Sequence, residues 1–309
     1  VQQHVKRCDR CQKGKPKTHK YGHLPPKVAE TTPWKGVCVD LIGPYTLKAK
    51  DGTILDFMCL TMIDPATGWF EIIELPIASV EVIREGDKIT KVILDKSSAM
   101  VSRLFNQTWL CRYPRAKYII FDNGSEFKLH FRELCESYSI KQKTTSVKNP
   151  AANSILERIH GVIKDMIRTS GIDMSDTITS EDIADVLSNV AWAVRSTYHT
   201  VLQTSPGAAI FGRDMLFDIP LIADWSDIGK RRQTAVNKDN ARENGKRIDF
   251  DYTVGQKVLI KRDGIICKLE DTYIGPYTIT QVYTNGTVRI QRGTISERLN
   301  IRRLAPYFE

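Results

Sequence analysis

Long hydrophobic runs and a regular cysteine framework are both missing from this 309-residue chain. No apolar run approaches the roughly 20 residues that a membrane-spanning helix needs, and no secretory signal is visible at the start. The seven cysteines are odd in number and irregularly spaced, which indicates a reduced intracellular protein rather than a disulfide scaffold. No Ser/His/Asp arrangement suggests a covalent nucleophile. The length predicts two or three domains.

Positive charge is in excess, with a net charge of +9, but it is unevenly spread. Residues 31–228 are slightly acidic, whereas residues 1–30, 229–248 and 249–309 are each basic. Lysine-rich linkers often serve only solubility. Basic segments that flank an acidic centre are, however, the pattern expected when a carboxylate metal site works on a polyanion such as DNA.

Three carboxylates stand at positions where a metal site could form. Asp40 lies inside the apolar strand expected over 36–42, and an ionised carboxylate there is costly unless it is paired or binds a metal. Asp122 follows the strand expected over 118–121, and Glu157 lies in the first turn of an amphipathic helix that runs to Arg168. Such a D, D, E set could hold two divalent cations for phosphoryl transfer.

Turn geometry is the plainer interpretation of an aspartate at the end of a strand. Asp122 precedes Asn123-Gly124, so it could be only a turn residue. Asp64, at the end of the strand expected over 55–63, stands before Pro65 and is assigned to turn geometry rather than to metal binding.

Motifs along nearly the whole length carry a family resemblance. The chain resembles the integrases of retroviruses and LTR retrotransposons, and is most similar to the gypsy-type (metavirus) branch. The stretches that carry the resemblance are VQQHVKRCDRCQ, YGHLPPK, PWKGVCVDLIGPY, TMIDPATGWFEIIEL, FDNGSEF, LCESYSIKQKTTSVKNPAANSILERIH, STYHTVLQTSPGAAIFGRDM and YIGPYTITQVYTNGTV.

The resemblance implies a fold and a set of domains. We expect an α/β protein with an RNase H-like core, a mixed five-stranded sheet flanked by helices, and a C-terminal SH3-like barrel of GPY type. The expected boundaries are listed here: a truncated N-terminal zinc-binding (HHCC) remnant at 1–25, a linker at 26–33, the catalytic core at 34–222, a basic linker helix at 223–249 and the barrel at 250–309.

The resemblance also implies an activity. Asp40, Asp122 and Glu157 would hold two Mg²⁺ (or Mn²⁺) ions for 3′-end processing and strand transfer of retrotransposon DNA into chromosomal target DNA. The enzyme would be a polynucleotidyl transferase that acts as a homo-multimer, dimer or tetramer, in the nucleus after assembly in cytoplasmic particles. No membrane partner is expected.

The N-terminal residues include half of a zinc-ligand set. Cys8 and Cys11 form a CxxC pair, and tetrahedral zinc needs four ligands. In the family the other two are upstream histidines, which the sequence, beginning at Val1, does not include; we expect Zn²⁺ only in the complete domain. His19 and His23 offer a Cys2His2 alternative with a short gap.

Basic and polar residues around these segments are the predicted DNA contacts. Lys164 matches a DNA-contacting position of the family, although an exposed helix lysine is an equal alternative. The full predicted set is Lys148, Asn153, Arg158, Lys164, Arg168, Lys230, Arg231, Arg232, Lys261, Arg262, Arg298, Arg302 and Arg303.

Two departures from the family pattern keep other functions open. Thirty-four residues separate Asp122 from Glu157, one fewer than usual, and Ser79–Lys96 resembles an inserted surface excursion. A catalytically inactive, domesticated integrase that binds DNA would fit these departures. A general RNase H-like nuclease would explain the core but not the GPY segment or the CxxC pair.

Overall fold

The computed structural model describes residues 5, 7–48, 50, 54–82, 90–144, 154–172, 178–262 and 269–309. The chain divides into two compact units, which we call the core unit (Ala29–Arg232) and the barrel unit (Val1–Val28 with Gln233–Glu309). Among the described residues, no helix has the length and apolar character to cross a bilayer.

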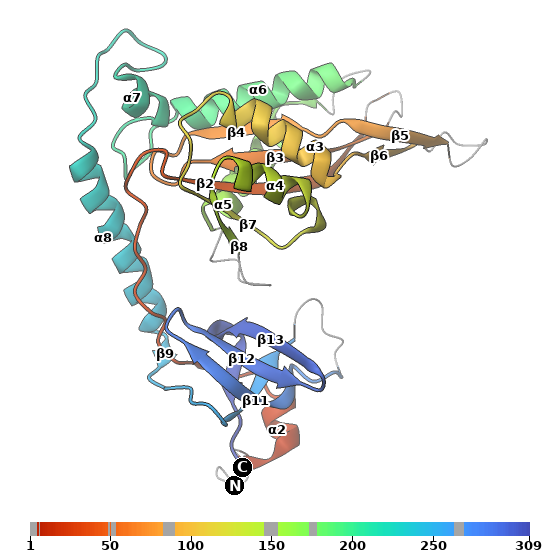
Figure 1. Ribbon diagram of the computed structural model, residues 1–309, viewed down its shortest axis with the longest axis vertical. Coiled ribbons are helices and arrows are strands. Elements are labelled where there is room, and N and C mark those ends of the chain that lie inside the picture. The colour runs from red at the N-terminus through yellow and green to blue at the C-terminus, as the bar shows by residue number, and fades with distance from the viewer. Residues whose placement is uncertain are drawn as a thin grey trace. The chain divides into compact units, whose positions relative to one another are not determined.

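A five-stranded mixed sheet organises the core unit (Figure 1). Its order is β4 (Phe70–Glu74), β3 (Ile54–Ile63), β2 (Gly36–Lys48), β7 (Tyr118–Phe121) and β8 (Lys141–Thr144). The first three strands are antiparallel, and β2, β7 and β8 run parallel. The sequence predicted that β2 would end before Gly43-Pro44. The strand instead continues to Lys48, because a register shift between Ile42 and Tyr45 absorbs these residues.

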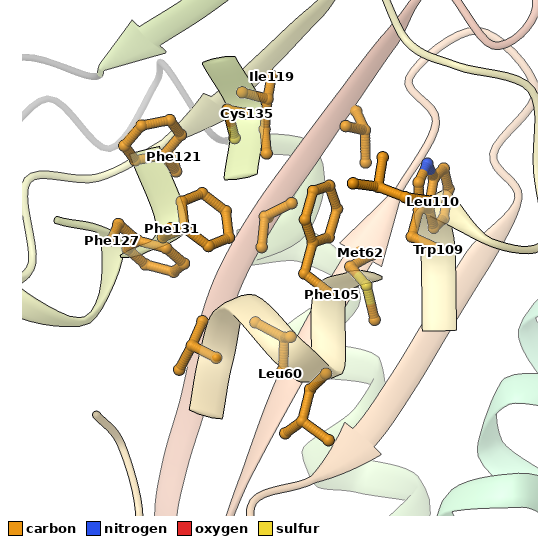
Figure 2. Packing of buried hydrophobic residues seen from close by; sticks show 14 of the residues in the cluster. Leu60, Met62, Phe105, Trp109, Leu110, Ile119, Phe121, Phe127, Phe131 and Cys135 are labelled. Atoms are coloured by element: carbon orange, nitrogen blue, oxygen red, sulfur yellow. The ribbon is translucent and has the colours of Figure 1, made fainter. Parts of the chain in front are cut away.

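Alternation along β2 buries both faces of the sheet. Val37 and Val39 face one apolar cluster with α3 (Ser98–Phe105), the π-helical turn Asn106–Leu110 and α4 (His130–Ser137). Figure 2 shows this cluster, in which Phe121, Phe127 and Phe131 have ring centroids 5.1–5.5 Å apart. The predicted aromatic and aliphatic stripe over 98–112 is therefore core, as expected from its helical spacing.

The other face of the sheet is covered by α5 (Ser154–Thr169) and α6 (Ser180–Ser196). Cys38 and Ile42 of β2 pack there against Leu156 and Ile163 of α5. Helix α6 starts at a capping box made by Thr179 and Asp182, and a short helix, α7 (Pro206–Phe211), follows it. The expected insertion forms a hairpin of β5 (Ile77–Val82) and β6 (Thr90–Leu94); its Gly86-Asp87 turn lies outside the described residues.

Five antiparallel strands form the sheet of the barrel unit. Their order is β13 (Ile295–Asn300), β12 (Thr287–Arg292), β11 (Tyr273–Tyr283), β10 (Lys257–Lys261) and β14 (Leu304–Pro306), with a 3₁₀ turn at Ile301–Arg303. Asn285-Gly286 connects β11 to β12 as the sequence predicted, and Gly286 takes the positive φ of 72° that this tight turn requires.

N-terminal residues are part of this barrel unit. Helix α2 (Asp9–Gly14) carries Gln12, whose amide donates to the Phe308 carbonyl (2.7 Å) and accepts from the Phe308 N–H (2.9 Å). Strand β1 (Lys20–Tyr21) pairs in parallel with β9 (Arg247–Ile248), and Leu24 joins the barrel's apolar core. Where the sequence divided 1–25 from 250–309, the structure packs the two segments together.

Helix α8 (Trp225–Asn244) begins in the core unit and ends in the barrel unit. Asn244, its last residue, accepts from the Leu24 N–H (2.8 Å) and donates to the Leu24 carbonyl (3.0 Å). The basic linker helix expected over 223–249 is therefore a helix, and its C-terminal end belongs to the barrel unit's hydrogen-bond network.

We predict that Leu24→Ala destabilises the barrel unit by about 2–5 kcal/mol, because it leaves a cavity in the core. The control is Val28→Ala, since Val28 is 91% exposed in the same unit. Amide hydrogen exchange in the full chain checks this: β11 and β12 amides should exchange faster in Leu24→Ala only. Equal protection in the two variants would show that the N-terminal segment adds nothing to the barrel.

Candidate active site

Parallel pairing of β2 with β7 brings two of the predicted carboxylates side by side. Val37 pairs with Ile119 and Cys38 with Ile120. Continued by two residues, this register places Asp122 opposite Asp40, at a strand separation of about 5 Å. Side chains two residues apart share one face of a strand. Because Cys38 and Ile120 both pack in the α5 and α6 cluster, Asp40 and Asp122 belong to that same face.

Helix α5 packs on this face of the sheet and carries the third predicted carboxylate. Leu156 and Ile163 are fully buried against the sheet, which fixes the helix there, and the neighbouring Glu157 is exposed in its first turn. Burial and the negative charges of Asp122, Glu157 and Glu126 raise the pKa of Asp40 to about 6. The two other predicted carboxylates therefore act electrostatically on Asp40.

Local hydrogen bonds orient the two aspartates. The Leu41 N–H donates to Asp40 Oδ1 (2.9 Å), and the Gly124 N–H donates to Asp122 Oδ1 (2.9 Å). Asp122 thus does form the turn contact that its Asn-Gly context predicted, while its position beside Asp40 is set by the strand. The turn contact is thus observed, and the site interpretation of Asp122 stays a prediction.

The donor set has the chemistry of a magnesium or manganese site, since clustered carboxylate oxygens are the ligands that these ions take. Mutual repulsion at Asp40 is also what a bound cation would relieve. Within the described residues, however, no three Asp, Glu, His or Cys side chains lie close enough to hold one ion. The charges of Asp122 and Glu157 thus act on Asp40, but the three carboxylates do not lie close enough together to coordinate one ion.

Glu126 is an acidic residue at this site that the sequence analysis did not single out. It lies in the 3₁₀ turn Ser125–Phe127, four residues after Asp122, and its charge acts on Asp40. A Cβ at Gly124 would come within 2.4 Å of Glu126 Oε1, so glycine leaves the space that this carboxylate occupies. Glu126 is the glutamate of the FDNGSEF stretch, so its position in the sequence, four residues after Asp122, could have indicated this role.

Asp64 has the turn role assigned to it. It is fully buried, and its carboxylate accepts from the Trp34 N–H (2.9 Å), the Ala66 N–H (3.0 Å) and the Thr67 hydroxyl (2.8 Å). Burial raises the pKa of Asp64, and these donors partly offset that effect.

Lys164 and Arg168 lie on the exposed side of α5 and line a pocket of about 460 Å³ with Lys48 of β2. Tyr45 and Ile167 contribute to its apolar lining. Arg158 is also exposed on this helix. Two further predicted contacts, Lys148 and Asn153, lie outside the described residues.

The predicted contacts on α8 differ from one another. Lys230 is exposed. Arg231 Nε donates to the Val201 carbonyl (3.0 Å) and Arg232 donates to the Ala66 carbonyl (2.8 Å). Burial lowers the pKa of Arg232. Both guanidinium groups therefore hold α8 within the core unit, which favours a structural role for them.

The cationic side chains of the barrel have different surroundings. Arg298 lies 3.9 Å from the Tyr283 ring centroid and Arg289 lies 5.9 Å from it. Lys261 is exposed, Arg262 lies 3.3 Å from Glu270, Arg302 pairs with Glu243, and Arg303 donates to the Lys261 carbonyl (3.3 Å). Arg289 was not predicted, because the alternation that exposes it becomes visible only in the paired strands.

The CxxC pair lies at the start of α2, where Cys8 is the cap residue. Hydrogen bonds from Cys11 lower the pKa of Cys8. No third zinc ligand joins the pair in the described part of the chain, so the Cys2His2 alternative with His19 and His23 is not assembled.

Curated relatives and solved structures are both similar to the chain. The Retrovirus-related Pol polyprotein from transposon 412 of Drosophila melanogaster is 25% identical over 278 residues, which cover 82% of this chain and 20% of the relative. The Caenorhabditis elegans protein K02A2.6, described as uncharacterized, is 25% identical over 268 residues, covering 84% and 18%. The chain therefore spans about a fifth of the length of these relatives. No family model matches it.

A chain in the cryo-EM structure of the simian T-cell lymphotropic virus intasome, in complex with PP2A regulatory subunit B56 gamma, has the same fold. The TM-score is 0.61 at 15% identity, over 98% of this chain and 88% of that one. The fold class is thus an RNase H-like core with a small SH3-like barrel, as predicted. The sequence similarity to a retrovirus-related Pol polyprotein and the shared fold agree with the resemblance of the chain to the integrases of retroviruses and LTR retrotransposons.

We predict that Asp40→Asn stabilises the metal-free protein above pH 6. A carboxylate whose folded pKa is raised from 3.8 to about 6 contributes stability below pH 3.8, and this contribution is lost as the pH rises through about 6. The variant lacks that loss, so its advantage in unfolding free energy should grow with pH to at most about 3 kcal/mol.

Urea denaturation in EDTA between pH 4 and pH 7.5 checks this, with Asp185→Asn as the control at an exposed position on α6. An advantage that is constant over this range would mean that Asp40 is not repelled by its neighbours.

Proposed function

We propose that this chain is an active integrase that trims the 3′ end of retrotransposon DNA and joins that end to target DNA. The observation that carries the proposal is the parallel register of β2 with β7, which when continued by two residues sets Asp122 opposite Asp40, together with the charges of Asp122 and Glu157 that act on Asp40. The homology to retrotransposon Pol polyproteins supports the choice of substrate, and the gypsy-type branch is part of the same proposal.

Both proposed steps are in-line displacements at phosphorus. In the first, a water oxygen bonds to phosphorus, the P–O3′ bond breaks, and the departing oxygen takes a proton to become a 3′ hydroxyl. In the second, that hydroxyl attacks a target phosphodiester: a new P–O bond forms as the target's P–O3′ bond breaks. Two Mg²⁺ or Mn²⁺ ions, when bound, would activate the attacking oxygen and stabilise the leaving oxygen.

The protein's own groups would hold and orient the ions and the DNA. Asp40 and Asp122 are supported on neighbouring strands, and Glu157 on a helix packed against them, so these carboxylates could converge on the ions by small side-chain adjustments. The α5 cations Arg158, Lys164 and Arg168 would contact DNA phosphates near the site. In the barrel unit, Arg289 and Arg298, which lie beside the Tyr283 ring on strands β11–β13, would contact DNA phosphates.

The remaining parts of the proposal concern assembly. Joining two DNA ends calls for a homo-multimer, dimer or tetramer, and action on chromosomal DNA calls for a nuclear location. Cys8 and Cys11 would bind Zn²⁺ together with upstream histidines. We propose these from the family alone.

A second candidate is a DNA-binding protein without catalytic activity. The observation that favours it is the absence, among the described residues, of a set of three ligands at metal-binding distance. The two candidates predict the same DNA binding and differ in joining.

Glu157→Gln should abolish DNA joining, because it keeps the side chain's shape and removes its charge. The assay uses Mg²⁺, a plasmid target and a pool of duplex oligonucleotides with randomised recessed 3′ ends, and products are sequenced. We expect the wild type and the control Glu181→Gln, at an exposed first-turn position of α6, to join ends alike. DNA binding by the wild type without any joining would favour the second candidate.

Removing the charges around the α5 pocket should weaken DNA binding. A Lys48→Ala, Lys164→Ala, Arg168→Ala triple variant loses up to three phosphate contacts, so its affinity should fall at least tenfold and its dependence on salt should become shallower. Fluorescence anisotropy from 50 to 200 mM salt, with Lys96→Ala as an exposed control, measures both. Unchanged affinity and salt dependence would place the DNA on another surface.

A further inference from the structure

One polar contact interrupts the apolar interface between α5 and the sheet. Around it, Ile159 and Ile163 of the helix pack with Cys59 and Ile63 of β3. Thr61 of β3, which is fully buried, has its hydroxyl oxygen 2.9 Å from Nε2 of His160 on α5. Thr61 is also the antiparallel partner of Asp40.

The hydrogens in this contact can be assigned. The Thr61 hydroxyl has a single hydrogen, and it donates that hydrogen to the Asp40 carbonyl (3.0 Å). With its hydrogen given to the Asp40 carbonyl, the same oxygen accepts from His160, which corresponds to the imidazole tautomer with its hydrogen on Nε2. Burial lowers the pKa of His160 to about 4, which keeps the ring neutral at physiological pH.

The contact connects two of the predicted metal-binding residues. Hydrogen bonds lead from the Asp40 carbonyl to the Thr61 hydroxyl and from there to His160. Glu157 precedes His160 by three residues, and residues three apart on a helix are neighbours. The surrounding apolar contacts have little directionality and would tolerate a small slide or rotation of α5. The hydrogen bond between Thr61 and His160 does not, because movement of α5 takes Nε2 of His160 away from its partner.

We propose that Thr61 and His160 are a positioning pair that sets the height and rotation of Glu157 relative to Asp40, and thereby the affinity of the site for divalent ions. This inference rests on the proposed function, because it assumes that these carboxylates bind metal. Neither residue would touch DNA or the reacting atoms. The pair would act through Glu157.

Paired substitutions separate positioning from folding. Thr61→Val replaces the hydroxyl with a methyl group, whereas Thr61→Ser keeps the hydroxyl. His160→Leu removes the donor, whereas His160→Gln keeps an Nε2–H group at a similar reach. Thr108→Val is the matched control, since Thr108 is a buried threonine in the same unit whose hydroxyl has no hydrogen-bond partner in the described structure.

Mn²⁺ affinity, measured by electron paramagnetic resonance of the free ion, is the main readout. We expect Thr61→Val and His160→Leu to bind Mn²⁺ five- to tenfold more weakly, with Thr61→Ser, His160→Gln and Thr108→Val close to wild type. In DNA joining, kcat should fall in the two disruptive variants while KM for DNA stays unchanged. For the wild type, ¹⁵N NMR of His160 should show the Nε2–H tautomer.

Several results would overturn the inference. An Nδ1–H tautomer would overturn it, because the Thr61 hydroxyl would then donate to Nε2 of His160 and no longer to the Asp40 carbonyl. This measurement needs neither metal nor activity. Wild-type Mn²⁺ affinity in Thr61→Val and His160→Leu, in a protein that joins DNA, would overturn the positioning role and leave the proposed function intact. A wild type that binds no Mn²⁺ and joins no DNA would overturn both.

Discussion

The candidate site depends on the parallel pairing of β2 and β7, because Asp40 lies in β2 and Asp122 directly follows the end of β7. A fold that needed only stability would not put Asp40 and Asp122 there, since burial and mutual repulsion raise the pKa of Asp40. The sheet tolerates the pair because apolar packing on both faces fixes the strands regardless of this cost. Such a conflict between local electrostatics and global packing is typical of functional sites.

Helix α5 then brings the third carboxylate to a site whose two other members are already fixed. Its apolar side attaches it to the sheet, its exposed side carries Lys164 and Arg168, and its first turn carries Glu157. In the proposed function, one helix would thus link ion binding to DNA contact. Any shift of α5 along the sheet would change both together, which gives the buried contact between Thr61 and His160 its importance.

Residues with a local signature were predictable from the sequence. Asp40 lies in an apolar strand, Asp122 precedes a turn, and Glu157 opens an amphipathic helix, so the fold class and the D, D, E candidates followed from pattern and resemblance. Thr61 and His160 were not paired, because 99 sequence positions separate them and no periodicity relates a strand threonine to a helix histidine. The inward orientation of Arg232 depends on a backbone carbonyl at Ala66, which a polar helix pattern cannot reveal.

Packing of the N-terminal residues with the barrel could not be predicted for a similar reason. Strands β1 and β9 are two residues each, too short for an alternation pattern, and Gln12 recognises backbone atoms of Phe308 rather than a side chain. Contacts to backbone leave no mark on the sequence of the partner. The barrel unit is thus built from two segments that are far apart in the sequence, and their contacts become visible only in the folded structure.

A crystal structure of the protein with Mn²⁺, with the ion located by its anomalous scattering, tests the central claim most directly. The account predicts manganese between the carboxylates of Asp40, Asp122 and Glu157, with their oxygens drawn to coordination distance. No anomalous peak at that position at saturating Mn²⁺ would contradict it.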